Sequence, residues 1–179
     1  MKNLKMLTTH IDERYGAVKA IGNYLSTYFD SYPRYDDIII VGIGTDKCIG
    51  DCLGPLVGTT LIRRDFSFPV YGTLKRPLHA LNLRNRVASI KSRHPNAFII
   101  AIDACLGEED NIGTIQIRSG PIDPGKGVGK NLPSVGDLSI IGIVEKLDNG
   151  SSVSLHNIRL SFVLEMAEII AEGIVLGLE

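Results

Sequence analysis

Short aliphatic runs alternate along this chain with longer segments that have the character of helices. The runs Ile38–Val41 and Ala97–Ile102 contain no polar residue, which is typical of strands buried on both faces of a parallel sheet. Helices are predicted over residues 11–29, 78–93 and 156–176, the first and last because their apolar side chains recur at helical spacing. This alternation predicts an α/β fold.

The remaining elements follow from the same patterns. A helix should begin near Leu53, with Pro55 in its first turn, where the missing N–H of proline is no loss. Strands are predicted over residues 68–72, 114–118 and 138–144. Only ten residues separate Asp103 from Thr114, too few for a helical crossover of about a dozen or more residues. The strand over 114–118 should therefore run antiparallel to its predecessor.

Together these elements predict one domain over residues 1–179. Its architecture should be a three-layer α/β/α sandwich with a mostly parallel sheet and at least one antiparallel strand. Residues 120–136 are rich in Gly and Pro and lack a hydrophobic period, and such long loops are usually functional or mobile. Residues 148–150 carry a strong turn signal.

Composition limits the classes of partner and the cellular compartment that we expect. The net charge of −1 gives no global field toward nucleic acid or an anionic membrane, so we expect neither as a direct partner. No apolar run approaches the ~20 residues that span a bilayer, and the N-terminal residues lack a signal-peptide core. Three cysteines, an odd count, suit a reducing cytoplasm.

Basic residues cluster locally in the middle of the chain. Two interpretations stay open: the solvated face of one helix with its neighbouring loops, or a docking surface for an acidic partner. The residues are Arg63, Arg64, Lys75, Arg76, Arg84, Arg86, Lys91 and Arg93.

Two aspartates follow the two aliphatic strands at corresponding points. Asp51 lies in the glycine-rich turn after Ile38–Val41, and Asp103 directly follows Ala97–Ile102. Chemistry in α/β sheets collects at the carboxyl ends of parallel strands, so neighbouring strands would bring the two acids together. A close pair of carboxylates splits its pKa values and can handle protons. The alternative is that one aspartate is a helix cap and the other a turn residue.

Other kinds of site fit the sequence less well. Position 47 is Lys where a dinucleotide fingerprint needs Gly, and Gly127 follows Lys126 where a phosphate-binding loop needs Ser or Thr. Cys48, Cys52 and Cys105 lack a nearby histidine for a zinc site and have no identifiable base for nucleophilic catalysis, so we interpret them as buried structural thiols. We expect no metal and no cofactor.

Several blocks of the chain resemble the YyaC family of sporulation proteins, a group associated with spore proteases. The resemblance is carried by residues 41–57, 102–107, 124–129 and 135–144 and by the Asn157–Leu160 entry to the last helix. More distantly, the turns around Asp51 and Asp103 and the loop 124–129 are similar to those of germination protease. That resemblance implies that Asp51 and Asp103 are the essential acids and that the fold is phosphorylase/hydrolase-like.

A third resemblance is to the hydrogenase maturation endopeptidases, which bind nickel through two acids and a histidine. Their acid positions correspond to Asp51 and Asp103, but the histidine position falls near Ser134, and no histidine occurs between His94 and His156. This departure argues against a nickel site.

The resulting hypothesis is an aspartate-dependent endopeptidase of the spore-protease type. Asp51 and Asp103 would activate water against a peptide or protein, with small acid-soluble spore proteins as candidate substrates and the cytoplasm of the forespore or spore as the compartment. The alternatives are a non-catalytic sporulation protein that binds a protein partner at the same edge, or a metal-dependent hydrolase that uses the two acids and a cysteine. The supporting residues would be Thr45, Asp46, Lys47, Gly127, Gly129 and Ser134.

Overall fold

The structure is a computed structural model that describes residues 6–31, 37–125, 132–146 and 158–179. In these ranges one mixed sheet of six strands has the order β1-β5-β6-β4-β2-β3. The strands are β1 Leu7–His10, β2 Ile38–Gly42, β3 Val70–Tyr71, β4 Phe98–Gly107, β5 Thr114–Ser119 and β6 Leu138–Lys146. The helices are α1 Arg14–Asp30, α2 Leu53–Arg63, α3 Leu83–Arg93 and α4 Leu160–Leu178, with 3₁₀ turns η1 Ile11–Glu13, η2 Ile49–Asp51 and η3 Glu109–Asn111.

The sheet is parallel through its centre and antiparallel toward one edge. β2 and β4 are parallel neighbours from the pair Ile38–Phe98 to the pair Gly42–Ile102, as the aliphatic runs predicted. β3 and β6 continue the parallel order on either side. β5 runs against β6, and β1 runs against β5. β5 is therefore antiparallel to β4, as expected, although β6 lies between them and pairs with both.

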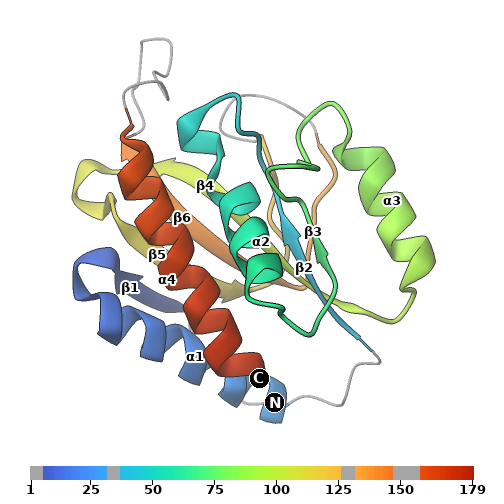
Figure 1. Cartoon of the computed structure of the whole chain (residues 1–179), viewed down its shortest axis with the longest axis horizontal. Helices are drawn as coiled ribbons and strands as arrows, with labels where there is room; N and C mark the ends of the chain where they lie inside the picture. Colours follow the sequence, from blue (N-terminus) through green and yellow to red (C-terminus); the bar gives the residue numbers. More distant parts are fainter. Residues whose placement is uncertain (1–5, 32–36, 126–131, 147–157) are drawn as a thin grey trace.

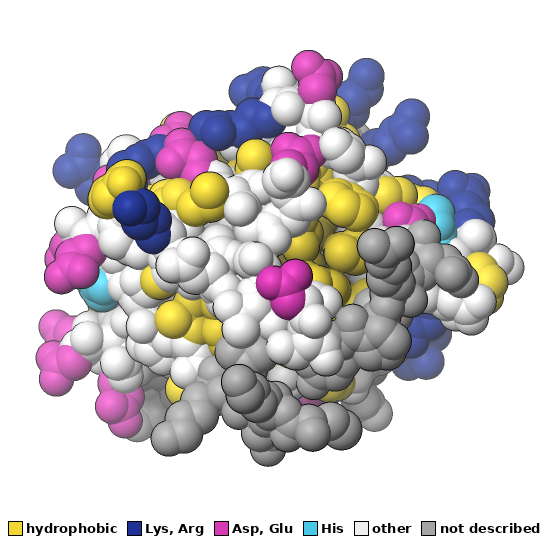
Figure 2. All heavy atoms as spheres, turned by 90° about the horizontal axis from the view of Figure 1, so that it is seen from below, with side chains coloured by type: hydrophobic (Ala, Val, Ile, Leu, Met, Phe, Trp, Pro, Cys, Tyr) yellow, Lys and Arg dark blue, Asp and Glu magenta, His cyan; other side chains and the backbone are white. Residues whose placement is uncertain are grey.

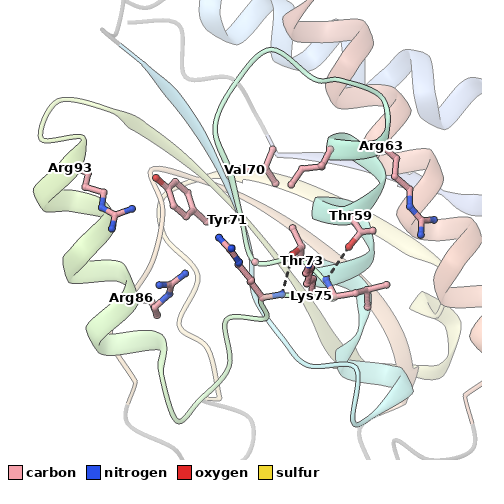
Figure 3. Close-up of a pocket in the computed structure, with 12 residues that line it drawn as sticks. Thr59, Arg63, Val70, Tyr71, Thr73, Lys75, Arg86 and Arg93 are labelled. Carbon is pink, nitrogen blue, oxygen red and sulfur yellow. Dashed lines mark hydrogen bonds between the residues drawn. The ribbon is translucent and has the colours of Figure 1, made fainter.

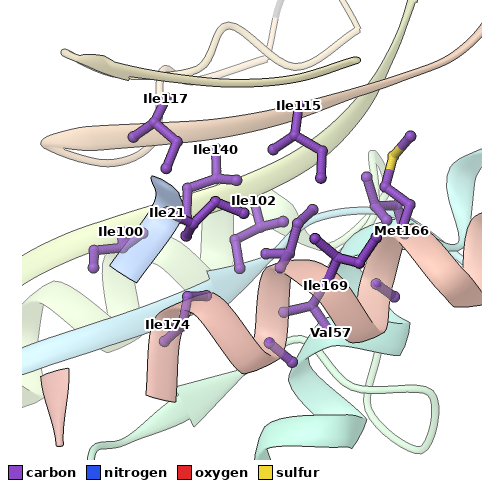
Figure 4. Close-up of a cluster of buried hydrophobic side chains, with 14 of the residues drawn as sticks. Ile21, Val57, Ile100, Ile102, Ile115, Ile117, Ile140, Met166, Ile169 and Ile174 are labelled. Carbon is purple, nitrogen blue, oxygen red and sulfur yellow. The ribbon is translucent and has the colours of Figure 1, made fainter. Parts of the chain in front are cut away.

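The two faces of the sheet are covered unequally. Figure 1 shows α1, α2 and α4 in front of the sheet, with α3 apart from them at the right. Ile100 and Ile102 of β4 point to the three-helix side and join the larger core, where they pack with residues such as Val57 and Met166 (Figure 4). Ile99 and Ala101 point to the other side, where α3 is the helix that covers them. The three-layer α/β/α sandwich is thus confirmed, with one layer much thinner than the other.

Two predicted boundaries moved for local reasons. α3 begins at Leu83 and not at Leu78, because the side chain of Asn82 closes a turn just ahead of it. Its Oδ1 accepts from the backbone N–H of His79 at 3.0 Å, and its amide donates to the carbonyl of Pro77 at 3.0 Å. β4 continues past Ile102 to Gly107, because β6 keeps pairing with it beyond the end of β2.

Other differences lie at the ends of the chain. The strand β1 was not predicted, and it adds an antiparallel partner to β5. α4 begins at Leu160, and the predicted start at His156 and the turn signal at 148–150 lie outside the described residues. Of the described helices, none is long and apolar enough to cross a membrane.

Candidate active site

The turn that leaves β2 positions Asp51 through its backbone. Gly44 has φ +131°, and a Cβ there would collide with the carbonyl oxygen of Asp51, so only glycine fits without a shift. The backbone N–H of Gly44 donates to the carbonyl of Leu78 at 2.7 Å, and that of Thr45 donates to the carbonyl of Asp51 at 2.9 Å. Asp51 thus ends η2 just ahead of the first turn of α2, as the sequence predicted, with Pro55 in that first turn.

Asp103 lies inside β4, one residue past the point where β2 stops. The β2 ladder ends with the pair Gly42–Ile102, while Asp103 is still paired with Ile141 of β6. Its side chain follows Ile99 and Ala101 in the strand alternation, so it points to the face that α3 covers only in part. The carboxyl oxygen Oδ1 accepts from the backbone N–H of Ala104 at 2.9 Å, and the residue is 9% exposed.

Both aspartates line one cleft of about 710 Å³. It opens past the end of β2, on the face of β5 and β6 that is opposite the core with α1 and α4. The turn after β2 supplies one wall, and Gln116 and Arg118 of β5 supply another, since they alternate with the core residues Ile115 and Ile117. Further lining residues are Cys48, Gly50, His79, Cys105, Ile122, Asp123, Pro124 and Leu132.

Electrostatics of the cleft favour a protonated Asp103. Burial is the main cause that raises the pKa of its carboxyl well above the ordinary value, and the negative charge of Asp51 raises it further. The hydrogen bond from the Ala104 N–H acts in the opposite direction and does not outweigh these two effects. A carboxyl that keeps its proton beside a second carboxylate can act as an acid.

The same environment keeps the neighbouring thiols neutral. Burial, reinforced by the charges of Asp46 and Asp51, raises the pKa of Cys52 to about 11. Burial and the charge of Asp103 raise the pKa of Cys105 to about 11, against a lowering effect of Arg118. A nucleophilic cysteine needs a lowered pKa, so this chemistry favours the aspartates over the thiols as the reactive groups.

The predicted supporting residues have mixed positions. Thr45 holds the turn through its backbone bond to Asp51 and through its hydroxyl, which accepts from the N–H of Lys47 at 3.3 Å. Asp46 and Lys47 are exposed and do not line the cleft. The Ser134 hydroxyl donates to Asp123 Oδ1 at 2.6 Å. Asp123 lines the cleft and Ser134 does not, so Ser134 contacts the cleft wall from outside. Gly127 and Gly129 lie outside the described residues.

Sequence reasoning missed His79, Arg118 and Gln116. The Nδ1 of His79 accepts from the backbone N–H of Leu81 at 3.3 Å, which assigns the proton of the neutral ring to Nε2. No sequence pattern marked His79, because it follows a connection without a hydrophobic period. Arg118 and Gln116 were visible as the polar positions of an alternating strand, but they meet the acids only through the order of the strands in the sheet.

The donor set does not fit the nickel site that the maturation endopeptidases imply. In the described ranges, no three His, Cys, Asp or Glu side chains are grouped so that they could hold a metal ion. His79 shares the cleft with the two acids without completing such a group. We therefore assign no step to a metal.

Comparison with known proteins places the chain in a family. A family described as "Protein of unknown function (DUF1256)" matches residues 9–173. The chain belongs to this family. It is 43% identical over 174 residues to the uncharacterized protein YyaC of Bacillus subtilis (strain 168), which covers 97% of this chain and 83% of the relative. The resemblance to YyaC is thus confirmed, while the more distant one to germination protease stays a prediction.

The comparison with solved structures also gives a similar protein. The [NiFe] hydrogenase maturation protease HycI from Thermococcus kodakarensis KOD1 is similar with a TM-score of 0.45 and 21% sequence identity. The similarity covers 83% of this chain and 98% of that chain.

Proposed function

We propose that this protein is a peptidase in which Asp51 and Asp103 act as an acid–base pair. The observation that supports it best is the buried carboxyl of Asp103 on the wall of the cleft that also contains Asp51. Burial and the charge of Asp51 raise the pKa of Asp103, so one acid holds a proton while the other is ionised. Peptide hydrolysis needs both states at once.

In the proposed reaction, Asp51 is the base and Asp103 is the acid. The Asp51 carboxylate takes a proton from water as the water oxygen bonds to the peptide carbonyl carbon. Asp103 gives its proton to the carbonyl oxygen, which stabilises the tetrahedral intermediate. The C–N bond then breaks as the nitrogen takes the proton from Asp51, and the hydroxyl proton returns to Asp103. The products are a carboxylic acid and an amine.

The size and lining of the cleft suit a peptide. A hollow of about 710 Å³ lies within the range of typical ligand sites, roughly 300–1,000 Å³. Ile122, Leu132 and Ile141 give it apolar surface, and Gln116 and Arg118 offer donors to substrate carbonyl oxygens. The proposal includes a protein substrate, and small acid-soluble spore proteins are the first candidates. It also includes the spore interior as the compartment.

The test is turnover of a mixed peptide library, read by mass spectrometry, for wild type and for Asp51→Asn and Asp103→Asn. Each substitution should lower turnover about a hundredfold or more, because acid–base groups typically contribute that much. Asp30→Asn is the matched control, since Asp30 is an exposed aspartate at the end of α1 and does not line the cleft. It should leave turnover unchanged.

The pH profile gives a second readout. Because Asp103 must be protonated to act as the acid, activity should fall as the pH rises through its raised pKa. Wild-type protein that cleaves no library peptide, spore protein or copy of itself at any pH would contradict the proposal and favour a binding protein. Turnover that survives both substitutions would place the chemistry elsewhere in the molecule.

A further inference from the structure

A second hollow of about 670 Å³ lies at the β3 edge of the sheet, between α2, β3 and α3. We call it the basic groove. Among the residues that the structure describes, no Asp or Glu lines it. Its five cationic lining residues come from three segments of the chain: Arg63, Lys75, Arg76, Arg86 and Arg93. Five of the eight basic residues that cluster in the sequence therefore line one groove, which the proposed peptidase chemistry does not use.

The cations surround the groove from opposite sides. Figure 3 shows Arg86 and Arg93 extending from α3 toward Tyr71 at the centre, with Arg63 across from them on α2. Within the described part of the chain, none of the five forms an ion pair. Their neighbour Arg64, by contrast, binds Glu172 at 2.9 Å. A hollow lined by unpaired charges of one sign concentrates a positive potential that an anion would relieve.

The frame of the groove is held by hydrogen bonds. The Thr59 hydroxyl on α2 accepts from the backbone N–H of Leu74 at 2.9 Å, which fixes the loop after β3. The Tyr71 hydroxyl bonds His94 Nε2 at 2.9 Å, and His94 Nδ1 lies 3.0 Å from Asp37. Tyr71 is thereby tied to the end of α3, so the floor of the groove and its arginine-bearing helix form one unit.

The charge is a local feature of the molecule. The chain as a whole carries −1, and Figure 2 shows acidic and basic side chains interspersed over one face. A nucleic acid needs a longer basic track or a series of aromatic platforms for its bases, and the groove presents one aromatic ring, Tyr71. A compact anion would be held by donors that meet at one point, whereas these five cations are distributed along the groove from α2 through the loop after β3 to α3.

We propose that the basic groove binds an extended acidic segment of a partner polypeptide. Spaced cations match carboxylates that are distributed along a chain. β3 is also an edge strand, and the backbone of such a strand can pair with an added peptide strand. This interaction goes beyond the proposed peptidase activity, because it uses none of the residues of the cleft.

The test is fluorescence anisotropy with a labelled Glu-rich peptide of about a dozen residues. Arg86→Gln combined with Arg93→Gln should weaken binding about tenfold, since two exposed charge pairs are lost. Arg84→Gln combined with Lys91→Gln is the matched control. These residues are exposed on the same helix and remove the same charge, but they do not line the groove. The control pair should change the affinity less than about twofold.

Four further measurements separate this proposal from its rivals. The probe with Gln in place of Glu should not bind, and Asp51→Asn combined with Asp103→Asn should bind the acidic probe as wild type does. If the Arg86/Arg93 variant and the Arg84/Lys91 variant weaken binding equally, the effect comes from the overall charge of α3, and the proposal that the groove is the binding site is wrong. Tighter binding of single-stranded oligothymidylate than of the peptide would make nucleic acid the partner. If the protein dimerises and the acidic peptide reverses the dimerisation, the partner is a second copy of this chain.

Discussion

The acidic cleft and the basic groove are of similar size and differ in what they do to their charged groups. In the cleft, burial raises the pKa values of Asp103 and Cys105, so these two groups keep their protons to a higher pH than they would in solvent. In the groove, all five cations are exposed on helices or a loop. Burial changes how readily an ionisable group gives up its proton, whereas an exposed cation stays charged and attracts the ligand that binds it. The cleft is thus suited to reaction and the groove to recognition.

The two sites also differ in how their side chains are positioned. The cleft depends on backbone: the turn after β2 fixes Asp51, and the end of the β2 ladder leaves Asp103 at an opening. The groove depends on side chains that project from α2 and α3 (Figure 3). A backbone change at the turn should therefore damage the cleft and spare the groove.

The largest effect on stability is expected for Gly44→Ala. The new Cβ would collide with the Asp51 carbonyl at a backbone φ of +131°, so we expect a loss of at least about 3 kcal/mol in the free energy of unfolding. Gly120→Ala is the control: its φ is +101°, but a Cβ there meets nothing within 4 Å, so the cost should be about 1 kcal/mol. Urea unfolding measures both. Equal losses would mean that the turn is not specially constrained.

Gly44→Ala also tests the separation of the two sites. If the protein is assayed at low temperature where it stays folded, turnover should fall with the displacement of Asp51, while the acidic peptide should bind as before. Loss of both functions together, in protein that circular dichroism shows to be folded, would contradict the comparison.

Much of the fold could be predicted because it depends on local patterns. The aliphatic runs of β2 and β4 identified parallel neighbours, and the short connection after Asp103 identified an antiparallel β5. The expectation that both acids lie at one strand edge followed from the parallel neighbours β2 and β4, because each acid follows one of these strands. The strand β1 has few aliphatic residues and owes its place to pairing with β5, which no local pattern reports.

The missed parts of the site depend on contacts between distant segments. Arg118 reaches the cleft because β6 is inserted between β4 and β5, and His79 because the bridge between Ile43 and Leu78 carries its segment to the turn after β2. β4 was expected to end at Asp103, since aspartate often ends a strand, but pairing with β6 overrides that preference. The basic groove was anticipated only as one of two interpretations of a charge cluster.

A smaller effect is expected when the buried acid is neutralised. The folded-state pKa of Asp103 is raised, so the native protein holds this proton more tightly than the unfolded chain. The stability that this proton provides is complete below the unfolded pKa of about 3.9, and it is lost as the pH rises through the raised value. Asp103→Asn keeps an Oδ1 acceptor for the Ala104 N–H and carries no charge at any pH.

Asp103→Asn should therefore gain thermal stability relative to wild type as the pH increases. The gain should be about 1.4 kcal/mol for each pKa unit of the shift, level off above the folded pKa, and vanish near pH 3.5, as read by calorimetry over a pH series. A difference between the two proteins that stays constant over this range would mean that Asp103 ionises in the folded protein as it does in the unfolded chain.

The smallest effects are expected at two thiols, Cys105 in the cleft and the buried Cys52 beside Asp51. With pKa values of about 11, Cys52 and Cys105 should react with iodoacetamide at pH 8 about a hundredfold or more slower than a free cysteine, whose pKa is about 8.5. Peptide mapping by mass spectrometry after timed alkylation gives both rates. Cys105→Ala, at a half-buried position, should change turnover less than about threefold, because a neutral thiol supplies neither a base nor a nucleophile. Fast alkylation together with a large loss of turnover would instead show that the cleft lowers the pKa of a thiol. The contrast between a cleft that holds protons and a groove that recognises a ligand would then be wrong.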